Sequence, residues 1–330
     1  MFLTINLILN NVAIKATHNG WCMSFLQENR IKFFYEAVQH GSVRAAADFL
    51  NVAPSAVSRQ ISQLENELDT VLIERHRRGI KPTEAGEELL KYYKHYLIQQ
   101  ELLLDNLKSL QGLQAGTIEL AIGEGFINIV SKAMCVFAEK YPDIKIVLSI
   151  HSGNDVLRKV VEDDAHIGVV FNPPQHPKIR THYTAIHPMI IAVGKQHPLN
   201  NEATPITMPV LKKYPLALPD LAHGVRQLIE EVEKEENVTF TPNVISNNMT
   251  ALHCYASHGG VTIMPSFMLK SMPDWYTSLN SLPFDNQRLN NTGSAVFTRL
   301  GRQLGPGPSE FIKCLVELFK QELDNDTPAV

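Results

Sequence analysis

The chain has 330 residues, of which 44% are hydrophobic and 19% charged, and its formal net charge is −4. This length exceeds one average domain and suits two or three, each able to bury its own core. The composition excludes a collagen-like or mucin-like protein, and the negative net charge excludes a uniformly basic surface for nucleic acid. Any contact with DNA must therefore come from a local basic patch.

The four cysteines lie far apart without C-x-x-C spacing, which is typical of reduced thiols in a cytosolic protein. No apolar run reaches the roughly 18 to 20 residues that a membrane-spanning helix requires. The start of the chain lacks the basic segment and the cleavage site of a signal peptide. Because periodic patterning begins only near Phe25, we expect Met23 to be the natural start and residues 1–22 to be a non-native extension. We expect a cytoplasmic protein that does not contact membranes.

Residues 30–68 have the apolar spacing of three short helices in close succession. The first ends at Gly41, a residue suited to the left-handed conformation that closes a helix. Ser42 then caps the second helix, and Asn51, which tolerates a left-handed backbone, turns the chain into the third. Pro54 falls in the first turn of the third helix, where a missing N–H costs nothing. The predicted inner faces are Ile31, Phe34, Ala37 and Val38, then Ala46, Ala47 and Leu50, then Val57, Ile61, Leu64 and Leu68.

The outward face of the third helix is suited to the major groove of DNA, because serine hydroxyls and one arginine offer donors and acceptors over two turns. Residues 75–82 follow with four basic residues around Gly79 and no acid, and they predict a small β-hairpin or wing that contacts phosphates. The alternative is a plain helical core with a solvated polar face. The tight turn, the serine-rich face and the basic wing together favour DNA binding. The residues expected at DNA are Ser42, Arg44, Ser55, Ser58, Arg59, Ser62, Arg75, Arg77, Arg78 and Lys81.

Thr83 caps a proline-free segment, residues 84–111, which predicts one long helix of roughly 40 Å. A seam of coiled-coil type on so long a helix cannot be covered by a small domain alone. We therefore expect residues 83–112 to form a linker helix through which the chain dimerises. The seam consists of Leu90, Tyr93, Leu97, Leu104 and Leu107.

From Gly116 onward the pattern changes to alternating strands and helices, and a βαβαβ order implies a parallel sheet with helices on both faces. Two successive rounds predict two α/β lobes with a ligand cleft between them. We expect lobe I at about 116–187 plus a C-terminal return at about 288–330, and lobe II at about 188–287. The predicted elements of the first round are 117–122, 129–141, 144–150, 155–163 and 167–171. Those of the second are 189–193, 216–218, 224–236, 243–246, 249–257 and 261–264, followed by 294–298 and 308–323.

The turns between strands and helices supply the candidate ligand contacts. Residues 123–128 invite comparison with a dinucleotide-binding turn, but Asn128 replaces the third glycine and no acidic ribose partner follows. We favour the interpretation that free N–H groups of this turn hold a polar group of a ligand. Because Glu124 is the one evident charge, the cleft favours a cationic or zwitterionic effector over a simple dianion, with exposed loop polarity as the alternative. The candidate contacts are Glu124, Gly125, Phe126, Ser152, Gly153, Asn154, Phe171, Asn172, Asn247, Asn248, Met249 and Thr250.

No catalytic or metal site is evident. His253, Cys254 and His258 are neighbours in sequence, but no third ligand stands nearby, so we expect no metal. The G-x-S-x-G, P-loop and H-E-x-x-H motifs are absent, so we expect no catalytic residues and no enzyme. An exported ligand carrier is a further alternative to a DNA-binding protein. It would leave the serine-arginine helix and the basic wing unexplained.

Residues 33–86 resemble the N-terminal signature of LysR-type transcriptional regulators, and the resemblance continues more weakly at 137–142 and 259–265. It implies a winged helix-turn-helix DNA-binding domain at 23–82, a linker helix at 83–112 and a periplasmic-binding-protein-like (type II) effector domain at 113–330. The signature consists of Phe33-Phe34, Gly41-Ser42, Ala45-Ala46-Ala47, Leu50-Asn51-Val52, the run from Ser55 to Ile61, Leu64-Glu65 and the run from Thr83 to Gly86.

The resemblance also implies that Pro54, Ser55, Ser58 and Arg59 lie in the major groove, with the wing arginines on flanking phosphates or in the minor groove. The implied partners are double-stranded DNA with an interrupted palindrome, a second copy of the chain in a dimer that often pairs into a tetramer, and RNA polymerase if the protein activates. The implied ligand is a small-molecule effector, without a cofactor. Pro54 stands where many members carry a polar side chain, and His166 stands where many carry an aspartate.

Overall fold

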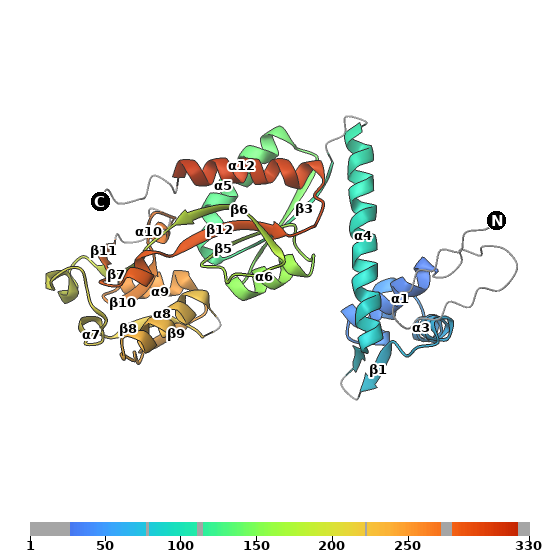
Figure 1. Ribbon diagram of the computed structural model, residues 1–330, viewed down its shortest axis with the longest axis horizontal. Coiled ribbons are helices and arrows are strands. Elements are labelled where there is room, and N and C mark those ends of the chain that lie inside the picture. Colours follow the sequence, from blue (N-terminus) through green and yellow to red (C-terminus); the bar gives the residue numbers. More distant parts are fainter. Residues whose placement is uncertain (1–26, 77–78, 111–114, 222, 272–278, 323–330) are drawn as a thin grey trace, which may run out of the picture. The chain divides into compact units, whose positions relative to one another are not determined.

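The computed structural model describes residues 27–76, 79–110, 115–221, 223–271 and 279–322 (Figure 1). The expected start at Met23 and the predicted extension 1–22 lie outside these residues, as do Arg77 and Arg78. Contacts between Cα atoms divide the chain into two compact units, residues 1–99 and 100–330. The long helix α4 (Glu84–Leu110) begins in the first unit and ends in the second.

The N-terminal unit is a helical core with a β-hairpin. It contains α1 (Glu28–Gln39), α2 (Val43–Leu50), α3 (Pro54–Leu68), β1 (Ile73–His76) and β2 (Gly79–Pro82), followed by the first part of α4. The apolar residues that the sequence places inside form this core: Phe34, Ala46, Val57, Ile61 and Leu64 are fully buried. The strands pair antiparallel, and the N–H of Ile80 donates to the carbonyl of Gly41 at 3.0 Å, which fixes the hairpin to the turn between α1 and α2.

The predicted caps and turns are confirmed. The Ser42 hydroxyl accepts a hydrogen bond from the N–H of Ala45 at 3.1 Å and caps α2. Asn51 has φ 54 and ψ 48, the left-handed conformation that swings α3 against α2. The Thr83 hydroxyl accepts from the N–H of Gly86 at 3.1 Å at the start of α4. These local bonds satisfy backbone donors that a helix start leaves free.

The expected dimerisation seam of α4 divides into two parts. Tyr93 is buried and its ring packs on that of Tyr35, with centroids 5.3 Å apart, while Leu90 and Leu97 pack against the same core. Tyr93 of the seam is therefore covered by the N-terminal unit itself, whereas Leu90 and Leu97 are half-buried. In the second half the side chains are exposed: Leu103, Leu104, Leu107 and Leu110.

Lobe I of the C-terminal unit is a five-stranded sheet in the order β4-β3-β5-β12-β6. Strands β4, β3 and β5 are parallel, whereas β12 runs antiparallel to β5 and β6, so the sheet is mixed rather than purely parallel. Helices α5 and α12 lie on one face of this sheet and α6 lies on the other (Figure 1). Side chains alternate along β3: Leu120 and Ile122 pack with α5 and α12, and Ala121 packs with α6. The elements are β3 (Gly116–Ile122), η1 (Glu124–Phe126), α5 (Ile127–Lys140), β4 (Ile144–Ile150), α6 (Gly153–Val161), β5 (Ile167–Phe171), β6 (Ile179–Ile186), β12 (Gly293–Arg299) and α12 (Pro306–Glu322).

Lobe II is a second five-stranded sheet, in the order β11-β7-β10-β8-β9. Helix α8 packs on one face of this sheet, and α9 lies on the other, where Met249 and Leu252 join the core of lobe I. Two strands were not predicted, β6 in lobe I and β11 here. The elements are β7 (Met189–Gly194), η2 (Pro198–Asn201), α7 (Met208–Leu211), β8 (Leu216–Pro219), α8 (Gly224–Glu235), β9 (Val244–Ser246), α9 (Met249–Ser257), β10 (Val261–Pro265), α10 (Phe267–Ser271), β11 (Leu279–Pro283) and α11 (Gln287–Asn290).

The chain crosses between the lobes twice, after β6 and before β12, and the two crossings are bonded to each other. The N–H of His187 donates to the carbonyl of Thr292 at 2.7 Å, and the Thr292 hydroxyl donates to the carbonyl of His187 at 2.5 Å. Both residues are buried. The two chain connections between the lobes thus lie side by side and are hydrogen-bonded to each other.

Candidate functional site

The predicted DNA-reading face is the exposed side of α3. Val57 and Ile61 point into the core and are fully buried, whereas Ser55, Arg59 and Ser62 are exposed. The spacing of the buried residues, four and then three, turns the polar residues outward. Pro54 is also exposed, at the first position of the helix.

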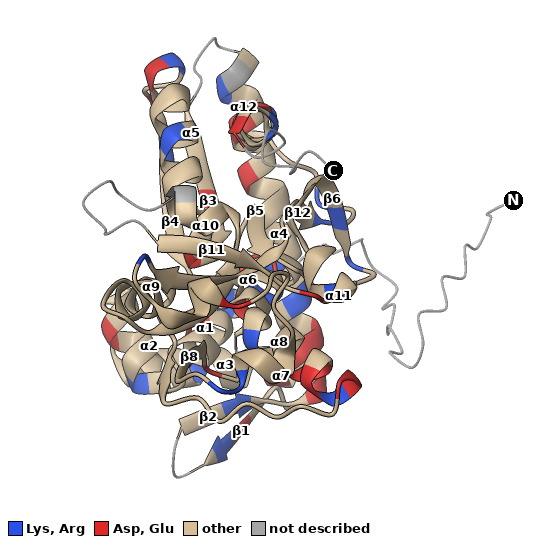
Figure 2. Cartoon of the chain, turned by 90° about the vertical axis from the view of Figure 1, so that its left-hand side faces the viewer, with Lys and Arg blue, Asp and Glu red and all other residues tan. Residues whose placement is uncertain are grey.

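The hairpin of β1 and β2 is linked to this face by a side-chain contact. The Arg75 guanidinium donates through Nη2 to the hydroxyl of Ser58 at 3.1 Å. Arg75 and Lys81 are exposed on the hairpin, and Figure 2 shows the basic colour on β1. Arg44 is exposed on α2, beside the cap residue Ser42. These polar and basic groups can meet phosphates and base edges, while the remaining two wing arginines lie outside the described residues.

Two adjoining cavities lie between lobe I and lobe II. The inner cavity has a volume of about 40 Å³ and the outer cavity about 230 Å³, and Gly153, Phe171 and Gly224 line both. Both cavities are bounded by turns at the carboxyl ends of strands, as the sequence predicts. The predicted residues found at them are Glu124, Gly125, Phe126, Gly153, Asn154, Phe171, Asn172 and Met249.

Four predicted contacts, Ser152, Asn247, Asn248 and Thr250, line neither of these cavities. The Ser152 hydroxyl caps α6, accepting from the N–H of Asp155 and donating to the carboxylate of the same residue at 2.8 Å. The Asn248 side chain accepts from the N–H of Ala251 at 2.7 Å and caps α9. A residue before a helix serves as well for capping as for ligand binding, and the sequence pattern does not distinguish the two.

Several residues that line the two cavities were not predicted from the sequence. The turn between β8 and α8 contributes His223 and Val225, and it is the same kind of strand-to-helix turn that identified the other candidates. Phe267 and Met268 follow β10 and close the inner cavity, where Phe267 stacks on Phe126 with centroids 4.9 Å apart. No sequence signal marks these two apolar residues as different from core residues. The other missed residues are His151, Val170, Pro173, Pro174, Gly224, Gln227, Leu228, Glu231 and Pro265.

Glu124 joins the two lobes. Its carboxylate accepts hydrogen bonds from the N–H of Met249 at 2.8 Å, the N–H of Thr250 at 3.2 Å and the hydroxyl of Thr250 at 2.7 Å. Glu124 belongs to η1 in lobe I, and its partners form the first turn of α9 in lobe II. A carboxylate at a helix N-terminus is stabilised by free N–H groups and by the helix dipole. The charge that we expected to face the effector is thus already bound within the protein.

The histidines at the inner cavity favour their neutral forms. Burial lowers the pKa of His151, and nearby Lys159 lowers it further. Burial also lowers the pKa of His223, although Asp220 and Glu124 act in the opposite direction. The Nδ1 atom of His223 accepts a hydrogen bond from the N–H of Val225 at 3.2 Å, as an unprotonated ring nitrogen does.

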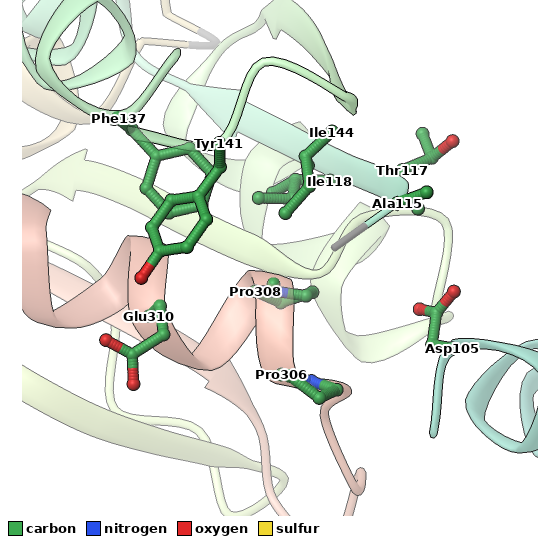
Figure 3. A pocket seen from close by; sticks show the side chains of 12 residues that line it. Asp105, Ala115, Thr117, Ile118, Phe137, Tyr141, Ile144, Pro306, Pro308 and Glu310 are labelled. Atoms are coloured by element: carbon green, nitrogen blue, oxygen red, sulfur yellow. The ribbon is translucent and has the colours of Figure 1, made fainter. Parts of the chain in front are cut away.

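A third cavity, of about 70 Å³, lies within the C-terminal unit at the end of α4 and contains none of the predicted site residues (Figure 3). In Figure 3 the rings of Phe137 and Tyr141 lie on one side and the carboxyl group of Asp105 on the other. Burial raises the pKa of Asp105. The cavity reflects how the last turns of α4 meet β3 and α12 rather than a strand-to-helix turn.

His166 takes part in a hydrogen-bonded loop. Its Nδ1 accepts from the N–H of Glu119 at 2.9 Å, while its Nε2 lies 3.8 Å from Oε2 of Glu101 on α4. The imidazole therefore connects the end of α4 with the sheet of lobe I.

Within the described ranges, no group of three or more His, Cys, Asp or Glu side chains is placed to hold a metal ion. The cysteines of this part, Cys135, Cys254 and Cys314, are free thiols. None of the described helices is both long and apolar enough to cross a membrane.

Two family models match the chain. Residues 29–87 match the bacterial regulatory helix-turn-helix protein of the lysR family, and residues 111–320 match the LysR substrate binding domain. The HTH-type transcriptional activator CmpR of Synechocystis sp. (strain ATCC 27184 / PCC 6803 / Kazusa) is a relative with 26% identity over 242 residues, which cover 73% of this chain and 79% of CmpR.

Solved structures show the same fold. A full-length variant of OxyR from Pseudomonas aeruginosa matches with a TM-score of 0.67 at 15% identity, covering 92% of this chain and 99% of that chain. Full-length CbnR in complex with its target DNA matches with a TM-score of 0.59 at 18% identity, covering 89% of this chain and 100% of that chain. The predicted resemblance and fold class are confirmed. The chain belongs to the LysR family and is a DNA-binding transcriptional regulator with a C-terminal effector-binding domain.

Proposed function

We propose that this regulator binds double-stranded DNA with α3 in the major groove and the β1–β2 hairpin on the neighbouring backbone. The observation that carries this assignment is the contact between Arg75 of the hairpin and Ser58 of α3, because it unites the polar helix face and the basic wing in one surface. The CbnR structure contains target DNA bound to a protein of the same fold. We place the activity in the cytoplasm, with no enzymatic step.

A small-molecule effector in the two cavities between the lobes is proposed to control DNA binding. The residues that line them come from both lobes, so a bound ligand contacts both and changes their relative angle. The lobes are joined through the hydrogen-bonded crossings at His187 and Thr292, which form the natural hinge. The family description as a substrate binding domain supports a ligand in this part of the chain.

The assembly is proposed to be a dimer built on α4 that pairs into a tetramer and binds an interrupted palindrome. The exposed leucines in the second half of α4 support this proposal, because apolar side chains at helical spacing gain stability when a second helix covers them. RNA polymerase is a further partner if the protein activates transcription.

The DNA assignment is tested by quantitative gel shift on the DNA upstream of the protein's own gene. Because a side chain at a base edge contributes roughly 1–3 kcal/mol of discrimination, we expect Arg59→Ala to weaken specific binding by about tenfold or more. Ser58→Ala is expected to weaken it less, since it removes one hydroxyl and the contact to Arg75.

The matched control is Lys32→Ala, which removes one exposed positive charge from α1 and is expected to leave specific binding nearly unchanged. Wild-type affinity in both the Arg59 and the Ser58 variants would overturn the assignment of α3 to the major groove.

A further inference from the structure

We infer that Glu124 is an internal carboxylate that occupies the hydrogen-bond donors at the start of α9, so that the cleft takes a neutral or cationic effector and excludes simple carboxylates. This inference rests on the proposed function, in which an effector binds between the lobes. It concerns one side chain and the class of ligand that this side chain permits.

The start of α9 supplies the hydrogen-bond donors that hold the Glu124 carboxylate. Two N–H groups and one hydroxyl, from Met249 and Thr250, converge on the Glu124 carboxylate at distances of 2.7 to 3.2 Å. Helix α9 has nine residues, long enough for its aligned peptide dipoles to favour a negative charge at this end. Three donors on one carboxylate are what a bound acid would use. In this protein the carboxylate comes from lobe I itself.

The other described residues that line the two cavities offer no positive charge to an anionic ligand. Among the described residues at the two cavities there is no Lys or Arg, so no cation is offered to a second carboxylate. The charged residues are Glu124 and Glu231, and Glu231 pairs with Arg288 at 2.5 Å. Burial keeps His151 and His223 toward their neutral forms by lowering their pKa values. An anion would therefore enter a lining of negative and neutral groups at an energetic cost.

The two cavities differ in the size of the ligand that they can hold. The inner cavity of about 40 Å³ has room for little more than a water-sized group, whereas the outer cavity of about 230 Å³ can hold a small organic molecule. The outer cavity offers amide groups from Asn154, Asn172 and Gln227 beside apolar surface from Pro173 and Leu228. Amides donate and accept hydrogen bonds without charge, which suits a neutral polar ligand.

Removing the Glu124 side chain leaves the donors of Met249 and Thr250 without their partner and opens a space of the size of a carboxylate. A small carboxylate from solution can then take the vacant position and restore the hydrogen bonds. Glu124→Ala is the suitable change, because it keeps the backbone between Gly123 and Gly125. Glu124→Gln keeps the volume and one acceptor but removes the charge.

The experiment compares the full-length wild type, Glu124→Ala, Glu124→Gln and the control Glu139→Ala, which removes an exposed carboxylate on α5. Each is titrated with sodium acetate and sodium propionate by isothermal calorimetry, and its melting temperature is followed in parallel, with sodium chloride at equal ionic strength. We expect Glu124→Ala to melt below the wild type and to be stabilised by acetate. We expect its acetate affinity to exceed that of the wild type, Glu124→Gln and Glu139→Ala by at least about tenfold.

Equal acetate binding by the wild type and Glu124→Ala, or none by either, would overturn the inference. If Glu124→Ala does not fold, Glu124→Gln decides: a melting temperature equal to that of the wild type contradicts a charged cap on α9, and a lower one supports it. A panel of neutral, cationic and dicarboxylate metabolites then tests the wild type. Binding of dicarboxylates in preference to the others contradicts the inference, whereas binding of no class contradicts the proposed effector function and leaves the acetate result on Glu124 standing.

Discussion

Buried and half-buried histidines give the C-terminal unit a defined dependence on pH. Burial lowers the pKa of His151, His182, His197, His223 and His253 below the ordinary value of 6.5. As the pH falls through 6.5, the unfolded chain takes up protons that the folded chain resists. The stabilising effect of the neutral rings is therefore fully present above pH 6.5 and is lost as the pH falls toward the folded pKa values.

We predict that the melting temperature of the wild type decreases between pH 7.5 and pH 5.5, and that His223→Asn reduces this decrease. Asparagine keeps a capping acceptor at the start of α8 but does not titrate, so its own stability at pH 7.5 should stay near that of the wild type. Differential scanning calorimetry at several pH values measures both effects. His95→Asn, which changes an exposed histidine on α4, is the control. An identical pH slope in His223→Asn would show that another group governs the dependence.

At the scale of elements, α4 serves two purposes along its length. Its first half completes the core of the N-terminal unit, through Tyr93 and Leu97, and its second half presents a row of exposed leucines. The same heptad-like spacing therefore leads to an intramolecular contact at one end and an unpartnered surface at the other. Burying exposed leucines releases roughly 25 cal/mol for each Å² of apolar surface, which favours a second helix there.

Substituting the exposed part of α4 should therefore change assembly without changing the fold. We predict that Leu104→Glu combined with Leu107→Glu shifts sedimentation toward the monomer by at least about tenfold in dissociation constant, because charges placed in an apolar helix interface oppose its burial. Far-ultraviolet circular dichroism should match the wild type. The control Lys91→Glu changes the charge of an exposed residue in the first half of α4. Unchanged sedimentation of the double variant would remove α4 as the dimer contact.

At the scale of the whole C-terminal unit, the two lobes are held together by polar contacts and by a shared apolar core. The crossings are bonded through His187 and Thr292 at one side, and Glu124 bonds to α9 within the cleft. The core also continues between the lobes, since Met249 and Leu252 of lobe II pack with residues of lobe I. A ligand that enters the cleft must therefore act against contacts that already hold the lobes together.

A separate prediction concerns the hydrogen bond between Thr292 and His187 at the crossings. Thr292→Val keeps the shape of the side chain but removes the hydroxyl that donates to the buried carbonyl of His187, and leaving such a group unsatisfied costs about 1–3 kcal/mol. Urea denaturation should show a loss of this order in the free energy of unfolding. Thr184→Val, at an exposed position of β6, should change it by less than about 0.5 kcal/mol. Equal stability of Thr292→Val and the wild type would show that the hinge bond is replaceable.

The sequence by itself determined the helical N-terminal unit, because its caps, turns and apolar spacing are local: Ser42, Asn51 and Thr83 each act within a few residues of their own position. It also determined the alternation of strands and helices that forms the lobes. Only the tertiary structure decided the antiparallel return of β12, the division of the α4 seam and the partner of Glu124. These depend on contacts between residues far apart in the chain, such as Glu124 with Thr250, and no local pattern records which distant donor a side chain will meet.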